Sequence, residues 1–161
     1  MIGYGNPLRG DDAFGWHAAH RLAELADREL INVLAVHQLT PELAEPVSKA
    51  EQVIFIDASH QGEPGTWKCE EIRHGVGLAN SLAHHFTPAS LLAYTSIIFN
   101  VSPWAQLIAF SAQSFGCGEA LTPCAEAALA EVLQHVLEEV LASPRIFMQL
   151  AQLNTAPKRL P

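Results

Sequence analysis

Two adjacent aspartates follow a glycine-rich turn close to the start of the sequence. The stretch GYGNPLRGDD covers Gly3 to Asp12 and leads directly into an amphipathic segment. Gly3 and Gly5 match the first two glycines of a dinucleotide-binding turn, but Leu8 occupies the third position. A diphosphate at this turn would meet two carboxylates, and like charges about 4 Å apart repel by roughly 1 kcal/mol even in water. The sequence therefore favours a cation over a phosphate here.

The acidic pair also has an interpretation that needs no ligand. Acidic side chains stabilise the positive end of a helix, so Asp11 and Asp12 are suitable capping residues for the helix that follows. Both interpretations stay open on the spacing alone, and neither supports a phosphate site.

Residue types that ligate metals occur at two further places. Asp57 ends the apolar run VIFID, and His84 and His85 stand just before Thr87. If Asp12 and Asp57 face one crevice, two carboxylates and an imidazole suit nickel, zinc, manganese or iron. Three protein ligands would leave coordination positions open, as a catalytic metal requires. Scattered Asp and His residues are also common as surface groups, so spacing alone does not decide.

The other histidines and the cysteines have simpler interpretations. His17 and His20 are three residues apart on one helix face, where polar exposure is a simpler expectation than metal binding. His135 is expected to be solvated on a long helix. The cysteines are odd in number, show no CxxC spacing and favour a reducing, cytoplasmic compartment. They are Cys69, Cys117 and Cys124.

Composition argues against two classes of protein. The 161 residues carry a formal net charge of −8, without a basic stripe that would bind nucleic acid. The apolar runs are too short to span a membrane, and the N-terminus does not resemble a signal peptide. We expect one domain over residues 1–150 and a flexible tail over 151–161.

Alternating helix and strand patterns predict the fold. Helices are expected over 13–27, 40–50, 87–99 and 122–143, the last three opened by Thr-Pro, and strands over 31–38, 51–59, 65–75 and 105–113. The pattern predicts a three-layer α/β/α sandwich with a mostly parallel central sheet of about five strands. Sites in such sheets form beyond the carboxyl ends of the strands, where the loops 3–12, 37–40 and 57–61 lie.

The first strand is expected to be very short. Only Met1 and Ile2 precede the glycine turn, whereas a strand usually has about five residues. Either the start was assigned too late or the central strand is cut short, and the second case predicts a loss of stability.

Taken together, these motifs resemble those of hydrogenase maturation proteases, the endopeptidases that trim the large-subunit precursor of nickel–iron hydrogenases. The segments occur in the family's order and spacing, and the Gly-x-Gly-Asn turn with its acidic pair is the most specific. They are GYGNPLRGDDAFG, HQLTPELAEPV, VIFIDAS, HHFTPASLLA and GEALTP. The HQLTPEL version is similar to the branch that serves bidirectional, NAD(P)-linked hydrogenases.

The resemblance implies an aspartate-type or metal-assisted hydrolase whose nickel arrives with the precursor rather than being tightly held. It implies that Asp12, Asp57 and His84 contact this nickel and take part in cleavage, with His85 as the alternative to His84. Further contacts with the substrate are expected from Asn6, Gln38, Thr40 and His85.

Two features depart from the family pattern. Many relatives carry glutamate where Asp12 stands, so the carboxylate here reaches one methylene less far. Some have an Asp-Gly-Gly-Thr turn where this chain has His37 to Thr40, so no role of that extra aspartate carries over. Two other functions stay open, a nucleotide- or cofactor-binding α/β enzyme and a non-catalytic nickel chaperone.

Overall fold

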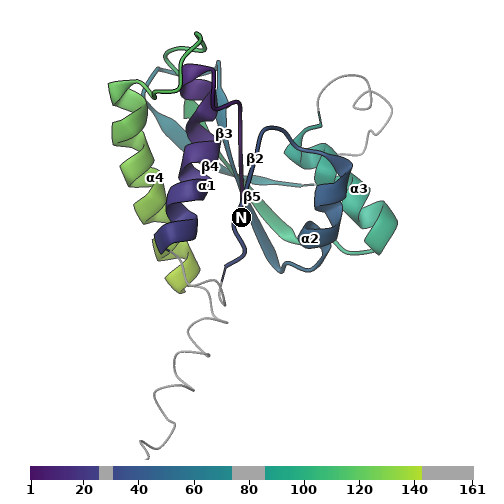
Figure 1. Cartoon of the computed structure of the whole chain (residues 1–161). Coiled ribbons are helices and arrows are strands. Elements are labelled where there is room, and N and C mark those ends of the chain that lie inside the picture. Colours follow the sequence, from purple (N-terminus) through teal and green to yellow (C-terminus); the bar gives the residue numbers. More distant parts are fainter. Residues whose placement is uncertain (26–30, 74–85, 143–161) are drawn as a thin grey trace, which may run out of the picture.

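The fold is built around one sheet of five strands (Figure 1). The computed structural model describes residues 1–25, 31–73 and 86–142. The strand order is β2-β1-β3-β5-β4, in which β4 is antiparallel to β5 and the other pairs are parallel. The strands are β1 (Ile2–Tyr4), β2 (Leu34–Val36), β3 (Gln52–Ser59), β4 (Trp67–Ile72) and β5 (Trp104–Ser111).

Helices cover both faces of this sheet (Figure 1). One face carries α1 (Phe14–Leu25) and α4 (Pro123–Ala142), and the other carries α2 (Ala44–Ser48) and α3 (Pro88–Phe99). Short 3-10 turns, η1 (Gly10–Ala13) and η2 (Pro41–Leu43), lead into α1 and α2. The predicted three-layer α/β/α sandwich is confirmed. The proposed tail, 151–161, lies outside the described residues.

The middle of strand β3, from Val53 to Ile56, is apolar because both of its faces are buried. Ile54 and Ile56 pack in the core beneath α1 and α4, whereas Phe55 packs in the core beneath α2 and α3. In the first of these cores Phe14 stacks on Phe110, with ring centroids 4.2 Å apart. Continuous apolar runs of this kind are typical of parallel strands between two helical layers. Packing on both faces fixes the position of β3, and therefore of the residues at its carboxyl end.

The first strand is short, as the sequence predicts, but it is central. β1 has three residues and lies between β2 and β3, with Ile2 almost fully buried. The amino group of Met1 donates a hydrogen bond to the carbonyl oxygen of Asn32 at 2.6 Å, and burial lowers the pKa of this amine to about 6. In the described part of the chain, no helix has the length and apolar character needed to cross a bilayer.

Two of the predicted helix caps are present. The hydroxyl oxygen of Thr87 accepts a hydrogen bond from the N–H of Ser90 at 3.2 Å, which caps α3. The hydroxyl oxygen of Thr122 accepts one from the N–H of Ala125 at 3.4 Å, at the start of α4. The Thr-Pro signature therefore predicts these two helix starts correctly.

Thr40 occupies the predicted N-cap position before Pro41, but its side chain makes no capping bond, and its hydrogen bond to Glu42 lowers the pKa of that carboxyl. The N-cap position suggested for the acidic pair is wrong. Asp11 and Asp12 lie inside the 3-10 turn η1, and the N-cap position of this turn is occupied by Arg9. The two aspartates are therefore available for other contacts.

Candidate active site

The candidate site lies where the carboxyl ends of the parallel strands meet. The register pairs Gly3 of β1 with Ile56 of β3, so Tyr4 and Asp57 are the next residues along two adjacent strands. Turn η1, which contains Asp12, follows β1 at this same edge. Open α/β sheets form their sites at this edge. The loops that the sequence predicts after these strands lie at this edge in the structure.

Asp12 and Asp57 are close enough to influence each other. Burial raises the pKa of Asp57 to about 6, and the negative charge of Asp12 adds to this rise. The phenol of Tyr4 and the N–H of Ala58, which donates to Asp57 Oδ1 at 2.8 Å, act in the opposite direction. The structure thus brings together the two carboxylates that the sequence singles out, each half-buried.

Tyr4 is a site residue that has no place among those predicted from the sequence. Its phenol lies within hydrogen-bonding reach of the Asp57 carboxylate, and burial, followed by the charge of Asp57, raises the pKa of this phenol. The available signal was its position between the two turn glycines, at the end of a strand. Recognising it requires knowing that β1 and β3 are neighbours.

Asn6 holds the turn that presents Asp12. The N–H of Asn6 donates to Asp12 Oδ2 at 3.1 Å, and its side-chain Oδ1 accepts from the N–H of Leu8 at 3.0 Å. The first bond links the backbone of the glycine turn to the carboxylate of Asp12, and the second lies within the turn itself. Contact between Asn6 and a substrate stays a prediction, whereas this internal role is present in the structure.

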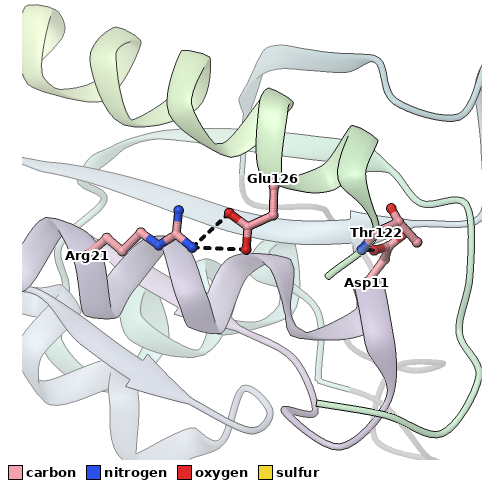
Figure 2. Close-up of polar contacts among 4 residues, drawn as sticks. All are labelled: Asp11, Arg21, Thr122 and Glu126. Atoms are coloured by element: carbon pink, nitrogen blue, oxygen red, sulfur yellow. Dashed lines mark hydrogen bonds and ion pairs between the residues drawn. The ribbon is translucent and has the colours of Figure 1, made fainter. Parts of the chain in front are cut away.

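Asp11, the first acid of the pair, points into the protein and is fully buried. Its Oδ2 accepts hydrogen bonds from the N–H groups of Gln113 and Ser114, at 2.9 and 3.2 Å, and from the hydroxyl of Thr122 at 3.0 Å. Its Oδ1 accepts from the N–H of Thr122 at 2.8 Å. Figure 2 shows Asp11 against Thr122, just before α4. The carboxylate therefore joins the loop before α1 to the loop before α4.

Further bonds fasten the same two loops together. The N–H of Gly10 donates to the carbonyl oxygen of Gly118 at 2.7 Å. The N–H of Gly118 in turn donates to the carbonyl oxygen of Leu8 at 3.0 Å. Farther along the helices, Arg21 forms a two-pronged ion pair with Glu126 at 2.8 and 3.0 Å (Figure 2). This pair is half-exposed, so we expect it to contribute at most about 1 kcal/mol to stability.

The remaining predicted site residues are placed less fully. Gln38 is exposed and Thr40 half-buried in the loop after β2, at the same edge of the sheet. His84 and His85 lie outside the described residues. Over 1–25, 31–73 and 86–142, no three His, Cys, Asp or Glu side chains form a metal-binding group. The described part of the site therefore consists of two carboxylates with their supporting contacts.

The histidines on the helices are partly packed. His135 is half-buried with its ring 5.1 Å from that of Trp67, so the prediction that it is solvated is wrong. His20 is exposed, as expected, and lies against Trp16. His17 is half-buried, and burial lowers its pKa. None of the three belongs to the candidate site.

A groove of about 270 Å³ lies at the opposite edge of the sheet. Its lining includes Arg73 at the end of β4, Leu92 of α3 and Trp104 at the start of β5. Apolar side chains from the end of α3 to the start of β5 are exposed in this region of the chain. They are Ile97, Ile98, Phe99, Val101 and Trp104. Neither Asp12 nor Asp57 lines this groove, so it is separate from the candidate site.

Solved structures of hydrogenase maturation proteases share this fold. HycI from Thermococcus kodakarensis KOD1 is 26% identical with a TM-score of 0.68, and the match covers 88% of this chain and 90% of that one. A hydrogenase 2 maturation peptidase from a Thaumarchaeota archaeon is 24% identical with a TM-score of 0.64, over 86% and 95% of the two chains. HybD from E. coli is 22% identical with a TM-score of 0.64, over 89% and 91%. No protein-family model matches the sequence, and no curated protein is significantly similar to it.

We expect Asp11→Asn to destabilise the protein strongly. An amide in place of the carboxylate would turn an NH2 group toward buried N–H donors and leave them unpaired, which costs about 2–4 kcal/mol in the free energy of unfolding. Urea denaturation followed by circular dichroism measures this loss. Asp12→Asn is the matched control, because that side chain is half-buried and accepts one backbone hydrogen bond. Equal stability of the two variants would contradict a structural role for Asp11.

We also expect Asp57 to make stability depend on pH. Its pKa is about 6 in the folded protein against an ordinary 3.8, so between these values the folded protein binds a proton that the unfolded chain has released. The contribution of Asp57 to the free energy of unfolding therefore falls as pH rises from about 4 to about 6, and is constant above. Urea denaturation across this range should show a shallower fall for Asp57→Asn. An unchanged slope would contradict the raised pKa.

Proposed function

We propose that this chain is an endopeptidase that removes the C-terminal extension from the large-subunit precursor of a nickel–iron hydrogenase. The observation that carries the proposal is the meeting of Asp12 and Asp57 at the carboxyl edge of a sheet whose fold is that of maturation proteases. The 26% identity to HycI over most of both chains supports the same activity. Two carboxylates at a half-buried edge are suited to hydrolysis, in which a water molecule must be oriented and deprotonated.

Nickel belongs to the substrate in this proposal. Asp12, Asp57 and His84, or His85 in its place, would contact the nickel that the precursor already holds. Two carboxylates and one imidazole form a weaker set for this metal than cysteine thiolates do. Such a set completes the coordination of the ion without removing it from the precursor, so the chain can recognise a loaded substrate.

The residues of the chain supply the acid–base chemistry. A carboxyl group with a pKa of about 6 is ionised at neutral pH and still basic enough to accept a proton from water. Asp57 can therefore deprotonate the water that attacks the scissile carbonyl, and can return the proton to the leaving amine when the peptide bond breaks. Nickel, when bound, orients the precursor and can polarise that carbonyl.

The loop after β2 bears on which hydrogenase is served. We propose the bidirectional, NAD(P)-linked class, on the basis of the segment HQLTPEL. Gln38 of this segment is exposed at the same edge of the sheet as the carboxylates, so it is available to a docked precursor. The carboxylates of Asp12 and Asp57 weigh against the alternative of a nucleotide site at this edge, because they would repel a diphosphate.

The decisive experiment incubates the purified chain with nickel-loaded and with nickel-free precursor and reads the C-terminal mass of the product. We expect cleavage of the loaded precursor only. Asp57→Ala should abolish cleavage while the protein stays folded, and Glu24→Ala, an exposed carboxylate on α1, serves as the matched control. Normal processing by Asp57→Ala would remove this residue from the site.

The same assay ranks the two neighbouring histidines. We expect His84→Gln to slow processing of the loaded precursor more than His85→Gln does, because His84 stands at the family's spacing before Thr87. Initial cleavage rates at equal enzyme concentration measure the difference. The reverse ranking would transfer the ligand role to His85.

A further inference from the structure

Arg9 is the exception among the basic residues that the structure describes. The ranges 1–25, 31–73 and 86–142 contain five lysines and arginines. Four of these form ion pairs: Arg21 with Glu126, Lys49 with Glu45, Lys68 with Glu70 and Arg73 with Glu71. Arg9 forms no ion pair with any described residue, although Asp11 and Asp12 follow it closely in a chain of net charge −8.

The backbone of Arg9 is fixed beside the candidate site. Its N–H donates to the carbonyl of Asn6 at 3.1 Å, and its own carbonyl accepts from the N–H of Asp12 at 3.2 Å. It also forms a bridge with Gly118 in the loop before α4. Arg9 and its neighbour Leu8 are both exposed. The backbone of Arg9 is thus held next to Asp12, while its side chain is exposed to solvent.

The nearby carboxylates already have other partners. Asp11 accepts four hydrogen bonds from Gln113, Ser114 and Thr122. Asp12 accepts the N–H of Asn6, and Asp57 accepts the N–H of Ala58 with Tyr4 in reach. Among the described residues, neutral donors therefore hold the acids of the site in place, and the guanidinium of Arg9 is left without an acidic partner.

We propose that the guanidinium of Arg9 binds a carboxylate of the precursor close to the bond that is cut. A guanidinium presents a planar fork of N–H donors that matches a carboxylate. The inference rests on the proposed function and adds a specificity-determining residue to it. The carboxylate has two possible sources, an acidic side chain of the extension that is removed or the free C-terminus of that extension.

The test compares the kinetics of wild-type, Arg9→Ala and Arg73→Ala on nickel-loaded precursor. Arg73 is the matched control, because it is an exposed arginine at the opposite edge of the sheet and its loss changes the net charge equally. We expect Arg9→Ala to raise KM about threefold to tenfold, the range for a partly screened charged hydrogen bond, with kcat unchanged. Arg73→Ala should match the wild type, and Arg9→Lys should recover part of the loss. Added salt should shrink the difference between Arg9→Ala and the wild type.

Two altered precursors identify the carboxylate. One carries an amidated C-terminus, and the other has the acidic residues of the extension replaced by their amides. The alteration that abolishes the difference in KM between wild type and Arg9→Ala identifies the recognised carboxylate, because that precursor lacks it.

Several outcomes would overturn the inference. They are an unchanged KM for Arg9→Ala, an equal rise for Arg73→Ala, a loss confined to kcat, and a difference that survives in both altered precursors. A wild-type chain that leaves the loaded precursor uncut refutes the proposed function, and the role of Arg9 with it. Normal kinetics of Arg9→Ala beside an active wild type refute the role of Arg9 alone.

Discussion

The buried carboxylate of Asp11 is the interaction on which the rest of the site depends. An ionised group removed from water costs several kcal/mol unless its hydrogen-bonding capacity is met. Here three N–H groups and one hydroxyl meet it, and they come from the loop after β5 and the start of α4. Because Asp11 itself precedes α1, one side chain ties together the two loops that open the helices on this face. Asp12, the next residue, takes its position from that attachment.

The two acids of the pair therefore have different functions, although they are adjacent and chemically identical. The tight 3-10 turn η1 directs Asp11 into the protein and leaves Asp12 half-exposed near Asp57. Neutral donors hold all three carboxylates, and none of them forms an ion pair with a described basic side chain. The edge of the sheet stays electronegative as a result, which suits a positively charged ion presented by another molecule.

Much of the fold could be predicted because its signals are local. The apolar run of β3 indicates a strand buried on both faces, and Thr-Pro at residues 87–88 and 122–123 marks two helix starts that the structure confirms. Local signals fail where a distant partner decides. The roles of Asp11 and His135 depend on Thr122 and Trp67, which lie 111 and 68 positions away along the chain. Tyr4 belongs to the site only through the register of β1 against β3.

The last strand of the sheet has a consequence for behaviour at high concentration. β4 pairs on one side with β5, and in the described part of the chain no strand pairs with its other side. A bare row of backbone groups like this is a template for strands of other molecules. Charged side chains succeed one another along and just beyond β4, as Lys68, Glu70, Glu71 and Arg73, and they pair with one another. A second copy of the chain could pair a strand with the outer side of β4 only by burying or displacing these charges. The sequence of β4 therefore disfavours self-association through this strand.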